Sequence, residues 1–318
     1  MIILVTGGAG FIGSNLCTKL LDQGHQVIAV DNFISSSQNN LKKLKKNPYF
    51  KFYQLDVTQK KFLKTLVKNH SKLDQIYHLA CPTGVPNCLT LAEEMIDACS
   101  CGTKQTLQLA LHFKATVVIA STAEVYGDPQ IFPQTESYQG NVSTTDERSA
   151  YEEGKRFTET LSALFVRKYG LQAKIARLFN AYGPYMSTRD TRVHPQMIQQ
   201  ALSNKPVTVY GNGQQTRTFC FITDTINGLL SIMEKGLTGE AYNVGNDQPT
   251  KIFDLAKLII SLSGSSSNIK FIPHFIADHH GRLPNIEKIT ALGWQKNINL
   301  ETGTKILIDY FRENRPKY

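Results

Sequence analysis

Tyr151 and Lys155 lie four positions apart in the run YEEGK, within a stretch over 151–169 that is expected to form a helix. Side chains at that spacing share one face of a helix, so the phenol and the ammonium should lie close together. A free tyrosine has a pKa of about 10, and a nearby ammonium favours the phenolate. We therefore expect Lys155 to lower the pKa of Tyr151, so that the phenolate can take a proton from a substrate hydroxyl. The spacing is common, so its meaning depends on the elements around it.

A second pair of polar groups follows the apolar run over 116–120, in the sequence STAEVYG. Such a run predicts a buried strand, and ligands bind outside the carboxyl ends of strands of this kind. The hydroxyl of Thr122 would bond to the reacting oxygen, and Glu124 would serve as a second base or acid. The alternative for Glu124 is a surface carboxylate with no part in the reaction.

A glycine-rich segment, TGGAGFIG, connects a predicted strand over 2–6 to a predicted helix over 11–22. Its three spaced glycines allow, in order, a tight turn, a close approach of the backbone to a pyrophosphate, and close packing of the helix. The amino end of the helix then offers N–H groups to phosphates. This pattern predicts a dinucleotide site, where a nicotinamide would take a hydride from the carbon whose hydroxyl Tyr151 deprotonates.

Carboxylates after the next two strands indicate which dinucleotide binds. Asp31 would accept hydrogen bonds from the adenine ribose and repel the 2′-phosphate of NADP, so NAD is favoured. Asp56 would accept from the adenine amino group, or would only cap a helix. The residues expected to bind NAD are Gly7, Gly10, Phe11, Ile12, Gly13, Asp31, Asn32, Asp56, Val57, Leu79, Ala80, Tyr151 and Lys155.

Short apolar runs alternate with amphipathic stretches through the first 180 residues. The runs cover 2–6, 26–30, 50–55, 75–79, 116–120 and 173–178, and the stretches cover 11–22, 60–68, 89–113 and 151–169. This alternation predicts an α/β fold of the Rossmann type, with a doubly wound parallel sheet. The pattern changes after Phe179, which predicts a smaller C-terminal lobe for the substrate. The expected boundaries are 1–179 plus about 219–245 for the NAD-binding domain, and about 180–218 plus 246–318 for the substrate domain.

The composition argues against several classes of function. The chain of 318 residues is 41% hydrophobic and 19% charged, and no apolar stretch reaches the length of a membrane helix, so we expect neither disorder nor membrane insertion. Many of the lysines behind the net charge of +9 lie between 42 and 72. We interpret them as a solvated surface, because no nucleic-acid-binding motif accompanies them. The six cysteines form no zinc or disulfide pattern, so we expect reduced thiols, no metal and a cytoplasmic location.

Together these segments resemble an extended short-chain dehydrogenase/reductase, a member of the NAD-dependent epimerase/dehydratase family. The resemblance rests on TGGAGFIG, Asp31, STAEVYGDP and YEEGK, and on the later segments FNAYGP, VYGNG, TRTF, YNVG and LGW. It is greatest to the UDP-glucuronate decarboxylases, through the run from Glu124 to Arg156 and the segments QALSNKPVTVYGNGQQTRTF and RLPNI. Members of the family epimerise, dehydrate, reduce or decarboxylate nucleotide sugars.

The resemblance implies an activity and a set of substrate residues. A decarboxylase of this kind oxidises C4 of the sugar, loses CO2 from the resulting β-keto acid and returns the hydride to C4. Tyr151 and Thr122 would stabilise the keto oxygen. The resemblance also implies a homodimer, built from the helices near 89–113 and 151–169. The residues implied to bind a UDP-sugar are Asn180, Arg192, Arg217 and Arg282.

Three places depart from the decarboxylase pattern, and one of them is Tyr185, which stands in Pro-Tyr-Met where Pro-Arg-Met is usual. Ala123 stands where those enzymes usually carry serine and where dehydratases carry an acidic residue. The segment 81–101 has Cys88, Glu94 and Cys99 about where the decarboxylases have tyrosine, lysine and asparagine. Two alternatives therefore stay open beside the decarboxylase. One is a nucleotide-sugar 4-epimerase or dehydratase, and the other is a catalytically weak NAD-binding module with a regulatory role.

Overall fold

Seven parallel strands form the centre of the molecule. The computed structural model describes residues 1–188, 190–273 and 281–314. Every neighbouring pair of strands in the sheet is parallel, as in a doubly wound Rossmann fold, so the predicted fold class is confirmed. In spatial order the strands are β11 (Ala241–Val244), β6 (Ala173–Leu178), β5 (Thr116–Thr122), β4 (Gln75–His78), β1 (Ile2–Thr6), β2 (Gln26–Asp31) and β3 (Phe50–Gln54).

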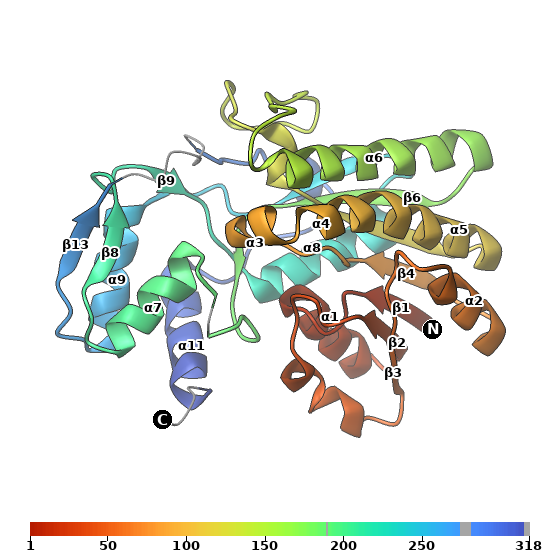
Figure 1. The fold of residues 1–318 in the computed structure, drawn as a ribbon, viewed down its shortest axis with the longest axis horizontal. Coiled ribbons are helices and arrows are strands. Elements are labelled where there is room, and N and C mark those ends of the chain that lie inside the picture. The colour runs from red at the N-terminus through yellow and green to blue at the C-terminus, as the bar shows by residue number, and fades with distance from the viewer. Residues whose placement is uncertain (189, 274–280, 315–318) are drawn as a thin grey trace.

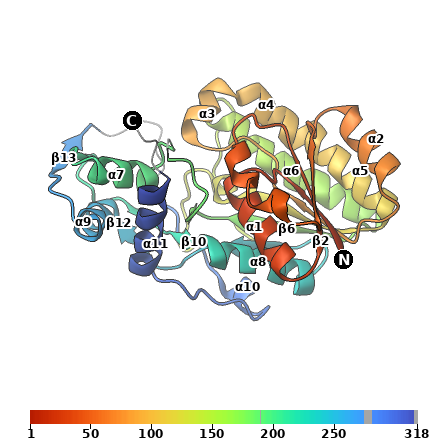
Figure 2. The ribbon, with the colours of Figure 1, turned by 90° about the horizontal axis from the view of Figure 1, so that it is seen from below.

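Helices cover both faces of this sheet (Figure 1, Figure 2). Alternate residues of β1 divide between the faces, because successive side chains of a strand point in opposite directions. Ile3 and Val5 pack with the helices of one face, and Leu4 packs with those of the other. Burial on both sides explains why the strands β1, β2 and β5 are largely apolar. The first face carries α1 (Phe11–Asp22) and α8 (Ile222–Lys235), and the second carries α2 (Lys60–Asn69), α5 (Thr103–Phe113) and α6 (Ser149–Tyr169).

The strand order reverses between β1 and β4. From β1 the chain passes to β2 and β3 on one side, and then crosses over to β4, β5 and β6 on the other side. The connections that leave β1 and β4 therefore run in opposite directions. In open α/β sheets this divergence opens a crevice at the carboxyl ends of the strands, where ligands bind.

A second group of elements lies beside the sheet, at the left of Figure 1. The parallel pair β8 (Val207–Tyr210) and β13 (Ile269–Ile272) belongs to it, together with three helices. These helices are α7 (Val193–Leu202), α9 (Ile252–Ser263) and α11 (Leu300–Glu313). Two short strand pairs accompany this group: β7 (Ala181–Tyr182) with β10 (Cys220–Phe221), and β9 (Thr216–Arg217) with β12 (Thr250–Lys251).

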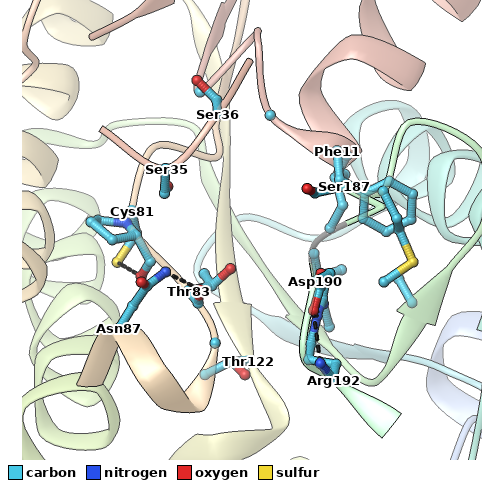
Figure 3. A pocket seen from close by; sticks show the side chains of 18 of the residues that line it. Phe11, Ser35, Ser36, Cys81, Thr83, Asn87, Thr122, Ser187, Asp190 and Arg192 are labelled. Carbon is cyan, nitrogen blue, oxygen red and sulfur yellow. Dashed lines mark hydrogen bonds and ion pairs between the residues drawn. The ribbon is translucent and has the colours of Figure 1, made fainter. Parts of the chain in front are cut away.

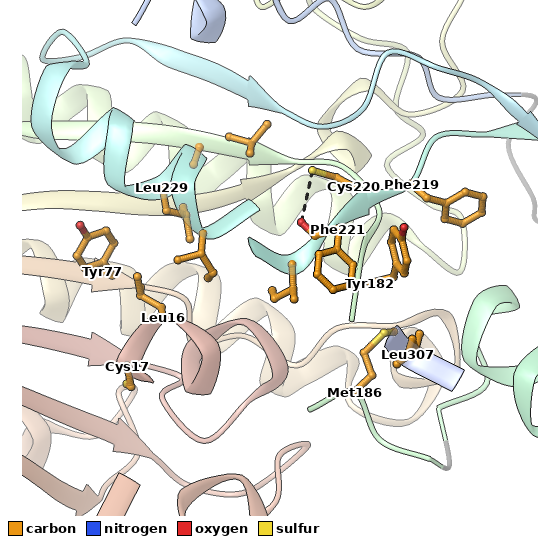
Figure 4. Packing of buried hydrophobic residues seen from close by; sticks show 14 of the residues in the cluster. Leu16, Cys17, Tyr77, Tyr182, Met186, Phe219, Cys220, Phe221, Leu229 and Leu307 are labelled. Atoms are coloured by element: carbon orange, nitrogen blue, oxygen red, sulfur yellow. Dashed lines mark hydrogen bonds between the residues drawn. The ribbon is translucent and has the colours of Figure 1, made fainter. Parts of the chain in front are cut away.

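Buried apolar side chains connect the two groups of elements (Figure 4). Leu16 of α1, Tyr182 and Phe221 of the short strands, and Leu307 of α11 belong to one continuous cluster. The sheet and the smaller group of helices therefore share a core. The division of the chain into two domains at the boundaries given above stays a prediction.

One predicted helix is wrong. The stretch over 89–113 is not a single helix but α3 (Val85–Thr90), α4 (Ala92–Asp97), the π-helical segment η3 (Ala98–Gly102) and α5. The break lies at Leu91, whose φ of −132° and ψ of 33° leave the helical region. Segment η3 packs against α6. The shorter helical turns are η1 (Gln38–Leu41), η2 (Leu44–Lys46), η4 (Ala123–Tyr126) and α10 (Glu287–Thr290).

Among the residues that the structure describes, the helices are too short or too polar to cross a bilayer.

Candidate active site

A pocket of about 1200 Å³ lies at the carboxyl edge of the sheet. Residues that follow β1 to β6 line it, from Gly7 after the first strand to Asn180 after the sixth. Figure 3 shows Thr83, Thr122 and the segment near them on one wall, and Asp190 and Arg192 on the facing wall. The volume exceeds the roughly 300–1,000 Å³ of a common small-molecule site. It is therefore large enough for two ligands side by side.

The glycine loop after β1 is shaped by close approaches of backbone to backbone. Gly7 has a φ of +72°, and a Cβ there would lie 2.9 Å from the amide nitrogen of Ala80. A Cβ at Gly13 would lie 2.1 Å from the carbonyl oxygen of Gly7, so only glycine lets α1 pack so close to the loop. The first turn of α1 has no side-chain cap at Gly10, and Phe11 lines the pocket. The amino end of α1 thus faces the pocket, which suits an anion.

Asp31, at the end of β2, lines the pocket and also supports its wall. One carboxylate oxygen accepts from the amide of Ala9 at 3.0 Å, and the other accepts from Phe33 N at 2.9 Å and Ser36 Oγ at 2.7 Å. A carboxylate has about four acceptor sites, so one more hydrogen bond can be accommodated. Asp31 therefore fixes the glycine loop and still presents an acceptor to a ligand.

Asp56, after β3, lines the same end of the pocket. Burial opposes its ionisation, but hydrogen bonds from Thr58 and Asn32 outweigh that effect and lower its pKa. Thr58 donates from its backbone at 2.8 Å and from its hydroxyl at 2.6 Å, and Asn32 donates at 3.1 Å. Asp56 therefore keeps both of the roles considered above, the adenine acceptor and the helix cap. Its carboxylate anchors the following turn, and it also faces the pocket. The remaining residues expected to bind NAD, Ile12, Val57, Leu79 and Ala80, also line the pocket.

The two catalytic elements predicted from the sequence meet at the end of β5. Thr122 lies at the end of β5 and Tyr151 lies on α6, and the Thr122 hydroxyl acts to lower the pKa of the phenol. Lys155 lies one turn further along α6, and its Nζ donates to the carbonyl of Ala120 at 2.9 Å. Tyr151, Thr122 and Lys155 all line the pocket. The site therefore places a phenol and a hydroxyl together at one wall.

The pKa of Tyr151 lies well above that of a free tyrosine, so the predicted lowering is wrong for this structure. Burial is the main cause, and Cys81, Glu124 and Cys99 raise the pKa further, whereas the hydrogen bond from Thr122 lowers it by less. The sequence spacing showed the ammonium on the same helix. It did not show the buried thiols and the carboxylate that other elements bring next to the phenol.

Glu124 is held between two arginines. Arg282 donates from Nη2 to one carboxylate oxygen at 2.6 Å and from Nε to the other at 3.2 Å. Arg148, just before α6, forms a second ion pair with Glu124 and is also 3.3 Å from Glu152 on the helix. Opposite charges at this distance favour the ionised carboxylate. This placement, in the pocket wall and between two cations, argues against Glu124 as a surface carboxylate.

Of the four predicted substrate residues, Asn180, Arg192 and Arg217 line the pocket, but Arg282 does not. The side chain of Arg282 is 5% exposed, and its third donor bonds to the carbonyl of Gly127 at 2.8 Å. Its donors thus hold Glu124 and the loop after β5 rather than facing the pocket. A contact between Arg282 and the substrate stays a prediction that this geometry does not favour.

Sequence reasoning missed Arg148, which lines the pocket beside Glu124. A signal was available, because Arg148 lies three positions before Tyr151 at the start of the same helix. The unusual segment 81–101 also contributes, since Cys81, Cys88 and Glu94 line the pocket.

Comparisons with known proteins agree on one family. The family model described as "NAD dependent epimerase/dehydratase family" matches residues 3–245. UDP-glucuronic acid decarboxylase 1 of Xenopus tropicalis is 38% identical over 312 residues, which are 98% of this chain and 72% of that protein.

Two solved structures have the same fold over nearly the whole chain. UDP-glucose 4-epimerase of Thermotoga maritima, with UDP-glucose, has a TM-score of 0.91 at 28% identity and covers 98% of this chain and 99% of its own. UDP-glucuronic acid 4-epimerase of Bacillus cereus, in complex with UDP-glucuronic acid and NAD, has a TM-score of 0.89 at 28% identity with the same two coverages.

Proposed function

Because the chain belongs to the NAD-dependent epimerase/dehydratase family, we propose that it is an NAD-dependent enzyme that decarboxylates UDP-glucuronate. One observation carries the proposal. The phenol and hydroxyl of Tyr151 and Thr122 share a pocket wall with Arg148, which is paired with Glu124. Tyr151 and Thr122 can bond to a sugar hydroxyl and accept its proton, and the guanidinium of Arg148 suits a sugar carboxylate. The decarboxylase relatives, at 38% identity and above, support the same activity.

The residues at the other end of the pocket fit NAD. Gly7 and Gly13 keep the amino end of α1 close to the pocket, where a pyrophosphate would meet its N–H groups. Asp31 offers an acceptor to a ribose hydroxyl and would repel a 2′-phosphate. Bound NAD supplies a hydride acceptor and donor for C4 of the sugar.

Tyr151 would take the proton of the 4-hydroxyl, and Thr122 would hold the same oxygen in place. Oxidation at C4 makes the uronic acid a β-keto acid, so the electrons of the C5–C6 bond flow into the ketone as CO2 leaves. Tyr151 and Thr122 then stabilise the developing oxyanion by hydrogen bonds. Glu124 is the second acid–base group in the pocket wall, and we propose that it exchanges the proton that C5 needs after CO2 has left.

A 4-epimerase is the second candidate, and Ala123 favours it. This residue is 4% exposed and offers no hydroxyl, whereas serine is usual there in the decarboxylases. An epimerase shares the oxidation at C4 but returns the hydride to the opposite face of the sugar. A dehydratase is a weaker candidate, because Ala123 cannot supply the proton that the leaving hydroxyl requires.

Incubation of the purified protein with UDP-glucuronate, followed by mass spectrometry, tests the proposal. We expect a UDP-pentose and one CO2 for each substrate consumed. Recovery of UDP-galacturonate with all its carbon would identify a 4-epimerase instead. No turnover of any UDP-, dTDP- or GDP-sugar, with NAD still bound, would support the non-catalytic module.

We also propose a homodimer in the cytoplasm. Large apolar side chains are exposed on α4 and α6, with Ile96 at 49%, Phe157 at 47% and Leu164 at 42% exposure. Burial against a second copy would remove this surface from water. Light scattering after size-exclusion chromatography should give twice the chain mass, and Leu164→Glu should give the monomer. The six cysteines are thiols, as is usual in a reducing compartment.

A further inference from the structure

Two cysteines lie next to each other directly behind the catalytic helix. Cys81 follows β4 in the pocket wall, and Cys99 lies in η3. Their Sγ atoms are 3.7 Å apart and share a thiol hydrogen bond. Cys99 is only 2% exposed, whereas Cys81 is partly exposed and lines the pocket (Figure 3). A small solute in the pocket can therefore reach the pair through Cys81.

The pair lies against the residues that carry the proposed reaction. A Cβ at Gly154, between Tyr151 and Lys155 on α6, would be 3.3 Å from both Cβ and Sγ of Cys99. Glycine at 154 therefore leaves the space that the Cys99 side chain occupies. Cys81 directly follows Ala80, whose amide lies against the glycine loop. Any change in the pair thus acts on both the catalytic helix and the wall that is expected to hold NAD.

The surroundings favour one thiolate in the pair. The hydrogen bond from Cys81 is the largest effect on Cys99, and with Lys155 and Thr158 it outweighs burial and lowers the pKa of Cys99 to about 6. The pKa of Cys81 is raised, because its proton is held in that hydrogen bond and the thiol is buried. The pair therefore favours a thiolate at Cys99, with the Cys81 thiol as its hydrogen-bond donor. The thiolate is the form of cysteine that reacts with peroxides.

We propose that Cys81 and Cys99 form a reversible disulfide with hydrogen peroxide, and that this disulfide switches off the active site. The thiolate sulfur attacks one peroxide oxygen, the O–O bond breaks, and hydroxide leaves and is protonated to water. The product is a sulfenic acid. The second sulfur loses its proton and attacks the sulfenic sulfur, the S–O bond breaks, and a second water leaves. Two thiols lose two electrons in total, and one peroxide is reduced to two waters.

The disulfide displaces residues of the site. An S–S bond is about 2.05 Å long, so the two sulfurs must approach by more than 1 Å from their separation of 3.7 Å. The two side chains must rotate, or the loop after β4 or η3 must move, and both segments pack against catalytic or cofactor-facing residues. Displacements of about 1 Å in an active site lower rates by about 100-fold. We expect the oxidised protein to lose at least about tenfold in turnover and to regain it with dithiothreitol.

Mass spectrometry of the full chain, with and without added NAD, tests the disulfide without any assay of activity. Trypsin leaves the four cysteines of 73–104 in one peptide, because no lysine or arginine lies between Lys72 and Lys104. Cleavage after Glu93 and Glu94 by an endoproteinase specific for glutamate separates Cys81 from Cys99. After peroxide treatment and alkylation, we expect a cross-linked pair of peptides that dithiothreitol separates. Fragmentation spectra then assign the two linked sulfurs.

Three variants complete the test. Cys99→Ser should abolish both the cross-link and the reversible inhibition, with thermal melting as the check on folding. Cys101→Ser, two positions away and exposed, should keep both effects. Cys88→Ser should also keep both, because the Cys88 thiol bonds to the carbonyl of Gly84 and, within the described residues, makes no hydrogen bond to another thiol.

The proposal is overturned if Cys81 and Cys99 can both still be fully alkylated after treatment with excess peroxide, with or without NAD. A cross-link from Cys81 to Cys88, or a disulfide that leaves turnover unchanged, would also overturn it. These outcomes do not depend on which nucleotide sugar is the substrate, so they are separable from failure of the proposed function.

Discussion

Glu124 and Arg282 are 158 positions apart in the chain, yet two hydrogen bonds of 2.6 Å and 3.2 Å join them. The pair fixes η4, which follows β5, to the segment before α10. It also orients the Glu124 carboxylate, which borders the Tyr151–Thr122 wall of the pocket. The arginine is therefore a positioning residue for Glu124, and its loss should affect both stability and activity.

Arg282→Met should lower the free energy of unfolding by about 2 kcal/mol, because it leaves a partly buried carboxylate with one of its two cations removed. Urea denaturation measures the change. Lys288→Met is the matched control, since Lys288 pairs with Glu240 at 2.6 Å on the surface. Exposed pairs contribute about 0–1 kcal/mol. Equal effects of the two substitutions would contradict the structural role given to Arg282.

Tyr151→Phe should lower kcat by at least about 100-fold, because it removes the base while keeping the ring. The dissociation constant of NAD should change little, since the phenylalanine ring is kept and the residues expected to hold the pyrophosphate and the adenine ribose, the glycine loop and Asp31, lie at the other end of the pocket. Steady-state kinetics and a fluorescence titration with NAD measure the two effects. A variant that retains most of its turnover would rule out the phenol as the base.

The raised pKa of Tyr151 predicts a pH dependence. The phenolate is the active base and is present above the pKa, so kcat/KM should rise as pH rises through the alkaline range. Burial contributes most to the raised pKa, and Cys81 is the next cause. Cys81→Ser should therefore move the rise to lower pH. Cys88→Ser also alters a residue that lines the pocket, and it should leave the rise in place. If the rise in kcat/KM moved to higher pH in Cys81→Ser, the Cys81 thiol would not be a cause of the raised pKa of Tyr151.

Asp31→Asn should reduce the preference for NAD over NADP by at least about tenfold. The substitution keeps the shape of the side chain and removes the charge that would repel a 2′-phosphate. Binding titrations with both cofactors measure the ratio. The amide can serve as an acceptor for Ala9 or Ser36 but not for every present donor, so a modest fall in melting temperature is also expected. An unchanged ratio would remove Asp31 from the cofactor site.

Buried strands were the easiest part of the fold to predict. The limits of β1 and β6 agree with the runs over 2–6 and 173–178, because strands covered on both faces are rich in apolar residues, although β6 also contains Lys174 and Arg177. Strand β13 escaped prediction, since Lys270 and Phe271 are exposed and the run is short. The break at Leu91 was not predicted, because helical periodicity in a sequence does not report the backbone angles of one residue.

The site was predictable where its residues are close in sequence. Tyr151 and Lys155 share one helix, and the glycine loop is continuous, so spacing alone placed them. Contacts across long stretches of chain were not predictable in this way. Arg282 reaches Glu124 only through the fold. The direction of the pKa shift of Tyr151 was wrong because sequence spacing reports neither burial, which is the main cause, nor the thiol pair that two separate elements bring next to the phenol.

Turnover of UDP-glucuronate carrying deuterium at C4 tests the central claim most directly, with product analysis by mass spectrometry and NMR. Removal and return of the hydride at one carbon predicts a UDP-pentose that keeps the deuterium at C4, formed by the wild type and not by Tyr151→Phe. Deuterium released to water, a product that keeps all six sugar carbons, or undiminished conversion by Tyr151→Phe would contradict the account.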